Sequence, residues 1–129
     1  MITNTLQMTL LVEDQEEAKK FYTEKLGFDV VADQSFGAQW RYITVAPQQN
    51  NTTVIELVKA ETPEQKALIG KQSGGQVLFM FHTDNIMEDY DVLHSRGVQF
   101  HSEPQSVPGG KGAGFKDLYG NDLDMFQPD

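Results

Sequence analysis

The chain has 129 residues, of which 39% are hydrophobic, and its formal net charge is −9. These values are typical of one compact domain with a sizeable core. The excess of carboxylates disfavours nucleic-acid binding, and no apolar run approaches the roughly 18 residues that a membrane span needs. Cysteine is absent, which excludes disulfides and thiolate metal sites. The first residues lack the basic and apolar regions of a secretory signal, so we expect a cytoplasmic protein.

The first half of the chain reads as a strand, a helix and three further strands. Residues 6–12 alternate as a half-buried strand does. Asp14 then predicts a helix N-cap, with Glu17 completing a capping box, and Gly27 stands where the helix should end. The strands predicted after this helix cover residues 28–32, 39–46 and 52–59.

A connector separates the first half of the chain from the second. It covers residues 60–75, and its middle has the signals of a short helix. Thr62 is the predicted N-cap, Pro63 the first helical residue, Gln65 the partner in a capping box and Gly70 the stop. This connector predicts a division between two structural modules.

The second half repeats the order of the first. A strand at 77–82 is followed by a helix that Asp84 should cap and Gly97 should end, the same spacing as Asp14 to Gly27. Strands are predicted at 98–101, 112–117 and 122–127, and the glycine-rich stretch at 109–114 is a candidate lid. We therefore expect an α+β fold of two tandem βαβββ modules, whose curved sheets form a cleft or partial barrel. The predicted boundaries are module one 1–59, connector 60–75 and module two 76–129, within a single domain 1–129.

Two motifs carry a resemblance to a known family. The segment from Asp14 through Ala18, Phe21 and Tyr22 to Leu26-Gly27-Phe28 resembles the opening motif of the vicinal oxygen chelate superfamily, which includes glyoxalase I, bleomycin-resistance proteins and extradiol dioxygenases. The segment from Phe115 to Asp124 resembles its closing motif, with Leu118 where proline is usual. The resemblance implies the paired-module fold, a small-molecule pocket and, commonly, a homodimer.

In the metal-dependent members of that superfamily, four inward-facing strand positions hold the ion. Counted onto this sequence they are Gln7, Glu56, Leu78 and Asp124. Leucine replaces the usual histidine, which weakens a metal site. The ligand set that the resemblance implies for an extradiol dioxygenase fails at two positions, Leu78 and Gln7. If a divalent metal binds Gln7, Glu56 and Asp124, the all-oxygen donors suit Mg²⁺ or Mn²⁺ better than Zn²⁺ or Ni²⁺.

Glu56 and Asp124 interrupt apolar strands, and a charge in such a place needs a polar partner or contact with water. Three interpretations stay open: a wet groove without specific function, a ligand pocket without metal, and a metal site. In a metal-free site either carboxylate is a candidate catalytic general base. His82 stands about 13 Å along the strand from Leu78 and so cannot replace the missing ligand.

Other predicted pocket residues follow from the strand alternation, which puts Trp40 and Tyr42 on one face with Arg41 on the other. Flat rings beside carboxylates suit a planar or cationic ligand. The predicted pocket comprises Gln7, Thr9, Trp40, Leu78, Met80, His82, His101 and Phe126.

The sequence therefore predicts a protein that binds a small organic molecule, with a degenerate metal site and with ligand sequestration as its candidate role. The alternative is a divergent metal-dependent lyase or isomerase of glyoxalase type that uses Glu56 and Asp124. No cofactor is firmly expected, and the expected partners are a small molecule and a second copy of the chain. A nucleic acid or a membrane is not expected.

Overall fold

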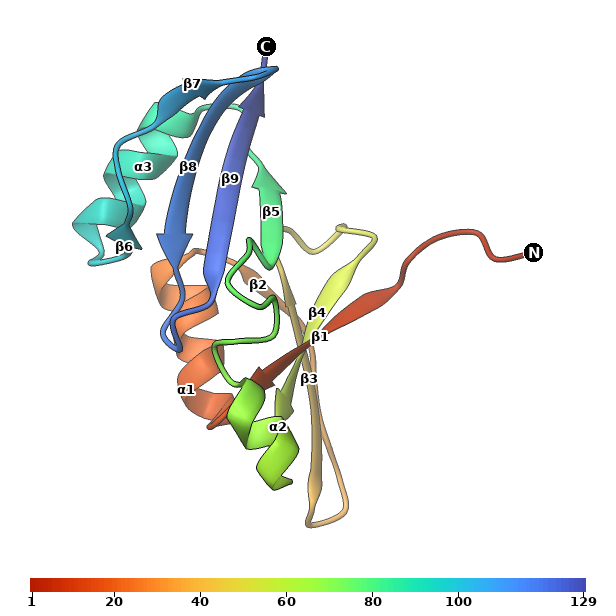
Figure 1. Cartoon of the computed structure of the whole chain (residues 1–129). Helices are drawn as coiled ribbons and strands as arrows, with labels where there is room; N and C mark the ends of the chain where they lie inside the picture. The colour runs from red at the N-terminus through yellow and green to blue at the C-terminus, as the bar shows by residue number, and fades with distance from the viewer. The chain divides into compact units, whose positions relative to one another are not determined.

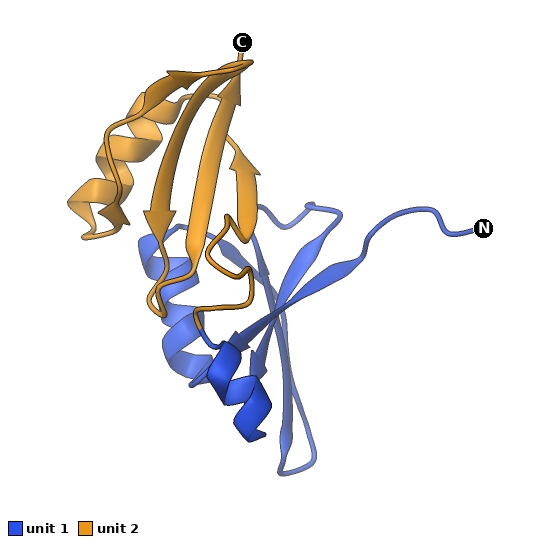
Figure 2. Ribbon diagram, viewed as in Figure 1, with its two compact units in different colours: residues 1–69 blue, residues 70–129 orange.

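The computed structural model describes residues 1–129, which form two compact units, Met1–Ile69 and Gly70–Asp129 (Figure 2). Each unit contains one mixed sheet and a helix between its first two strands (Figure 1). The α+β class is confirmed, and the βαβββ order recurs in both units, with one additional short strand, β7, in unit 2. Both sheets also share one topology, in which the first strand of the unit lies beside the last.

Unit 1 holds a four-stranded sheet, sheet A, with the strand order β1-β4-β3-β2. Strand β1 runs parallel to β4, and the other pairs are antiparallel. Its elements are β1 (Gln7–Val12), α1 (Gln15–Lys20), the π-helical turn η1 (Phe21–Lys25), β2 (Asp29–Phe36), β3 (Trp40–Ala46), β4 (Val54–Lys59) and α2 (Pro63–Leu68).

The helix ends of unit 1 follow the predicted capping residues. The Asp14 side chain accepts a hydrogen bond from the Glu17 amide at 2.8 Å, which fixes the start of α1. Thr62 and Gln65 form the predicted reciprocal capping box of α2. Gly27 ends the first helical segment with a φ of 77°. These local signals set the register in which each helix meets the sheet.

The core of unit 1 lies on the face of sheet A that carries α1. Leu10, Ile55 and Leu57 are buried on this face, and so are Ala18 and Tyr22 of the helical segment. Glu56 lies between Ile55 and Leu57 in β4 and therefore points to the opposite face. The alternation predicted for this strand is confirmed. Met8 lies on the same face as Ile55, with which the register pairs it, and is 46% exposed near the start of β1.

Unit 2 holds sheet B, with the strand order β5-β9-β8-β6 and with β7 paired to β8. Strand β5 runs parallel to β9, and the other pairs are antiparallel. Its elements are β5 (Phe79–His82), α3 (Ile86–Ser95), β6 (Gln99–Phe100), β7 (Gln105–Val107), β8 (Gly110–Lys116) and β9 (Asp122–Pro128).

The core of unit 2 forms where α3 packs on β8 and β9. Ile86 and Leu93 of the helix are buried, as are Phe115, Leu123 and Met125 of the sheet. A hydrogen bond from the Ile86 amide to the Gln127 side chain, 2.7 Å long, ties the helix start to β9. Asp124, between Leu123 and Met125, therefore points to the other face of sheet B.

Several predictions about unit 2 are wrong. Asn85 caps α3, because its side chain and not that of Asp84 accepts from the Glu88 amide. The predicted strand 98–101 shortens to two residues, and β7 was not predicted. The glycine-rich stretch 109–114 is not a lid, because Gly110 to Gly114 lie within β8 and pair with both β7 and β9. Small side chains let this segment form a strand between two neighbours.

In unit 1, the predicted strand 28–32 in fact extends to Phe36 as β2. It pairs with β3 from Asp29↔Ala46 to Phe36↔Trp40, across a register shift between Val30 and Ala32. That irregularity interrupts the alternation of the strand and explains why its second half was missed.

Candidate functional site

The face of sheet A opposite α1 carries the candidate site. Arg41 and Asp33 lie on the α1 face, because they form ion pairs with Glu16 and Lys19 of that helix. The neighbours of Arg41 in β3, Trp40 and Tyr42, therefore point to the opposite face, as predicted. We call this face, which also carries Glu56, the open face of sheet A.

Three polar side chains on three strands of the open face form a hydrogen-bonded chain. The Tyr42 hydroxyl donates to Oε1 of Gln7 at 2.6 Å, and Nε2 of Gln7 donates to Oε1 of Glu56 at 2.9 Å. Both ends of the Gln7 amide are thereby engaged, so its orientation is fixed. Glu56 accepts this bond through one oxygen, and its other oxygen stays available to a ligand.

An aromatic row lies beside this chain on strands β2 and β3. The rings of Phe36 and Trp40 have centroids 4.9 Å apart at an interplanar angle of 32°, and Trp40 meets Tyr42 edge-on at 6.1 Å. Trp40 is 55% exposed and Phe36 49% exposed. Neighbouring exposed rings of this size form an apolar platform, which on a protein surface commonly marks a binding site.

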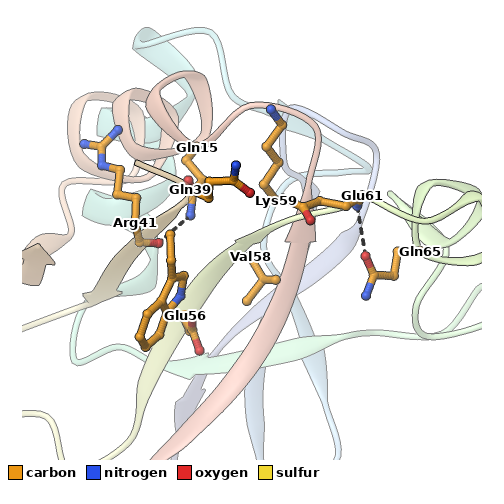
Figure 3. Close-up of a pocket in the computed structure, with 9 residues that line it drawn as sticks. Gln15, Gln39, Arg41, Glu56, Val58, Lys59, Glu61 and Gln65 are labelled. Carbon is orange, nitrogen blue, oxygen red and sulfur yellow. Dashed lines mark hydrogen bonds between the residues drawn. The ribbon is translucent and has the colours of Figure 1, made fainter. Parts of the chain in front are cut away.

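A cavity of about 340 Å³ lies next to the platform (Figure 3). Residues that line it include Gln15, Trp40, Glu56, Val58, Lys59 and Gln65. Its volume falls in the usual range for small-molecule sites, roughly 300–1,000 Å³. Trp40 and Glu56 therefore link the open face of sheet A to a cavity of ligand size.

The α1 side of the sheet supplies rigid support beneath the platform. Asp33 accepts hydrogen bonds from Arg41 at 2.8 and 2.7 Å and from Lys19 at 2.9 Å. The hydrogen bonds from Arg41, reinforced by Lys19, hold the pKa of Asp33 well below its usual range. In return Asp33 and Glu16 hold the pKa of Arg41 above its ordinary value. This network ties β2 and β3 to α1 behind Trp40.

Unit 2 has its own open face, on the side of sheet B opposite α3. The strand register places Met80 beside Asp124 and His82 beside Phe126. His101, just after β6, donates its backbone amide to the Gly114 carbonyl, and Gly114 pairs with Asp124. Met80, Asp124 and His101 therefore belong to one row across the open face of sheet B.

The two aspartates of β9 on this face have opposite environments. Asp122 contacts Lys116 at 3.1 Å and His101 at 3.0 Å. The hydrogen bonds from Lys116 and then His101 hold the pKa of Asp122 below its ordinary value. Partial burial raises the pKa of Asp124, although the backbone amide of Met125 and the charge of His101 act against it. Asp124 is thus the carboxyl group on sheet B that most readily stays protonated.

The predicted site residues fall into two groups. Unit 1 contains Gln7, Thr9, Trp40 and Glu56, and brings Gln7 into contact with Glu56 while the register places Thr9 beside it. Unit 2 contains Leu78, Met80, His82, His101, Asp124 and Phe126. Leu78 precedes β5 and donates its backbone amide to the Asp122 carbonyl. His82 contacts Asp84 at 3.7 Å at the exposed end of β5.

Sequence reasoning missed three contributors to the candidate site in unit 1. Phe36 fell outside the predicted second strand, although it faces Trp40 across the β2–β3 turn. Tyr42 was placed on the correct face but not beside Gln7. Gln15 gave no signal, because its side chain bonds backbone carbonyls 26 and 42 residues away.

Comparison with known proteins identifies the class to which this fold and these open faces belong. Residues 5–125 match the model of the Glyoxalase/Bleomycin resistance protein/Dioxygenase superfamily. An uncharacterized protein of Shewanella frigidimarina is 37% identical over 128 residues, covering 98% of this chain and 95% of its own length. YetH of Bacillus subtilis, also uncharacterized, is 31% identical and covers 94% of this chain and 95% of its own length. The chain belongs to this superfamily, as the motifs at Asp14–Phe28 and Phe115–Asp124 predicted.

Among solved structures, TnmS3 from Streptomyces sp. CB03234, described as an antibiotic binding protein, is similar with a TM-score of 0.81 and 34% identity. It covers 99% of this chain and 98% of its own. UcmS2 matches with a TM-score of 0.84 and 34% identity over 98% of both chains. A glyoxalase I variant from Zea mays shares the fold at 18% identity. No helix of the chain is long and apolar enough to cross a membrane.

Members of the superfamily often hold a divalent metal, but the donor set here does not fit one. Oε1 of Gln7, the amide oxygen of the predicted ligand set, accepts a hydrogen bond from the Tyr42 hydroxyl. The fourth position, Leu78, has no donor atom in its side chain. No group of three or more histidine, aspartate or glutamate side chains is arranged to hold an ion. Two of the predicted ligands, Gln7 and Glu56, are instead joined to each other by a hydrogen bond.

Proposed function

We propose that this protein binds a small planar organic molecule on the open face of sheet A, as a binding protein of the antibiotic-binding kind. The observation that carries the proposal is the exposed ring pair of Phe36 and Trp40 beside the carboxylate of Glu56. A flat ligand stacks on the indole and fills the adjacent cavity. Glu56 then accepts a hydrogen bond from the ligand, or pairs with its positive charge.

The chemistry of the open face favours a neutral or cationic ligand over an anionic one. Among the hydrogen-bonded side chains Gln7, Tyr42 and Glu56, only Glu56 carries a charge, which is negative. The whole protein also has a net charge of −9. An indole face attracts a cation through its quadrupole, an effect of about 0.5–2 kcal/mol. The likeness to TnmS3, described as an antibiotic binding protein, supports a small organic ligand. A planar ligand matches the flat aromatic platform.

Titration of the intrinsic fluorescence tests this proposal, because Trp40 is the one tryptophan in the chain. Proflavine is a planar cation at neutral pH, and acridine is a similar planar molecule without charge. We expect both to quench Trp40, with proflavine binding more tightly. Glu56→Gln should remove most of the preference for proflavine, whereas Glu64→Gln on the exposed surface of α2 should leave it intact. Absence of saturable quenching by either compound would refute the proposal.

The alternative of a glyoxalase-type lyase requires a metal or a base in reach of a substrate. Asp124 is the candidate general acid or base for a reaction without metal, because burial raises its pKa. The test is turnover of the hemithioacetal formed from methylglyoxal and glutathione, followed by absorbance. Turnover that is lost in Asp124→Asn would favour this alternative over ligand sequestration.

A further inference from the structure

The side chain of Gln15 connects two strands of sheet A, β3 and β4, beyond the residues at which they pair. The register between β3 and β4 consists of Thr44↔Glu56 and Val45↔Ile55. Further along, Nε2 of Gln15 donates to the Arg41 carbonyl of β3 at 2.9 Å and to the Leu57 carbonyl of β4 at 2.8 Å. One amide group therefore bridges β3 and β4 where their ladder of backbone pairs has ended.

The cavity beside Trp40 lies at this bridge between β3 and β4. Gln15 lines it together with Trp40 and Val58, and Figure 3 shows the bond from Gln15 to Arg41 at its wall. The guanidinium of Arg41 points away from the cavity in the same view, toward its partners on the α1 side. Gln15 is thus a part of the cavity that also bridges the two strands.

The two carbonyl groups fix which way the amide of Gln15 faces. A carboxamide has two N–H donors and one acceptor oxygen, and both donors are used here. Turning the amide over would set its oxygen against two carbonyl oxygens, which cannot donate. Oε1 of Gln15 is consequently a fixed acceptor that forms no hydrogen bond within the protein and is available at the cavity wall.

We propose that Gln15 is a specificity-determining residue, whose Oε1 selects planar ligands that present an N–H or O–H donor at the edge nearest the cavity. This inference rests on the proposed function and narrows its ligand class. A ligand that stacks on Trp40 without such a donor leaves the fixed oxygen desolvated and unpaired. A site built to bond a ligand donor rejects the analogue that lacks it for this reason.

Naphthol and its methyl ether test the inference, because they differ by one O–H donor and share the same rings. Quenching of Trp40 gives both dissociation constants. We expect naphthol to bind the natural protein about three- to tenfold more tightly. Gln15→Met removes the acceptor at similar volume and should bring the ratio close to one. Gln99→Met, which changes an exposed glutamine of β6 outside this cavity, should keep the preference.

The outcomes separate the two proposals. Equal binding of naphthol and its ether to the natural protein would overturn the role of Gln15, whether or not the variant folds. A preference that persists in folded Gln15→Met would overturn it as well. Failure of both compounds to quench Trp40 would instead refute the planar-ligand site on sheet A, and with it the role of Gln15 there.

Discussion

Gln7 donates its side-chain amide to the carboxylate of Glu56 across 2.9 Å, from the strand next to it in sheet A. The same amide accepts from Tyr42, so both polar atoms of Gln7, one of the predicted metal ligands, are already bonded to protein groups. Gln7 and Glu56 thus form a polar edge of fixed geometry beside the aromatic platform of Phe36 and Trp40. Such an edge orients a ligand without an ion.

Treatment with a chelator should therefore leave ligand binding unchanged. Dialysis against EDTA is expected to keep the dissociation constant for proflavine the same, because Gln7 is held by Tyr42 and Glu56 in the metal-free arrangement. Elemental analysis of the protein before dialysis, grown with Mn²⁺, Ni²⁺ and Zn²⁺, provides the control. Stoichiometric metal that disappears in Glu56→Gln would contradict this prediction.

Asp33 should stabilise the fold at neutral pH and lose this effect in acid. Its pKa is lowered in the folded state by Arg41 and Lys19, so its contribution is complete above the unfolded value of about 3.9 and fades as pH falls through the folded value. Asp33→Asn should cost about 1–2 kcal/mol at pH 7, since charge-assisted bonds between partly exposed groups are lost. Urea unfolding at pH 7 and near pH 2 measures the difference, which should shrink in acid. An equal cost at both values would contradict the ion-pair explanation.

Asp124 should have the opposite pH dependence. Its pKa is raised by burial, so the folded state holds its proton more tightly than the unfolded state does. Stability is therefore lost as pH rises from the ordinary aspartate value, about 3.9, through the raised folded value. Asp124→Asn should raise the melting temperature at pH 7 and change it less at about pH 3. A variant that is less stable than the natural protein at pH 7 would show that the charged form makes favourable contacts.

Gly70 should tolerate no side chain. Its φ is +75°, and a Cβ added there would lie 2.2 Å from the Tyr119 carbonyl oxygen in the same unit. The positive φ alone costs a non-glycine residue roughly 1–2 kcal/mol. Gly74→Ala isolates that cost, because Gly74 has a φ of +65° with no atom within 4 Å. Gly70→Ala should lower the free energy of unfolding by clearly more than Gly74→Ala, as measured in urea. Equal losses would mean that the Tyr119 loop moves aside.

The sequence predicted the fold where local signals were strong. Asp14, Thr62 and Gly27 placed the helix ends, because capping depends on residues within one turn of each other. The alternation around Glu56 and Asp124 gave the correct facing, since a strand repeats every two residues. The Asn85 cap was missed because two residues with good capping side chains, Asp84 and Asn85, stand next to each other.

The candidate site was predicted less completely, because its contacts join residues that are distant in the chain. Gln7 lies 35 residues from Tyr42 and 49 from Glu56. Phe36 joins Trp40 only because β2 continues past its irregularity into a hairpin. Strand alternation gives the face on which a side chain lies, but not which neighbour it bonds.

Calorimetric titration of proflavine against the natural protein and Trp40→Leu tests the central claim most directly, because heat of binding needs no fluorescent reporter. Met87→Leu, at an exposed residue of α3, is the control for an apolar surface change. We predict saturable one-to-one binding to the natural protein and to Met87→Leu, with affinity reduced about tenfold or more in Trp40→Leu through loss of ring stacking. Equal affinity in all three proteins would contradict a ligand site on the Trp40 platform.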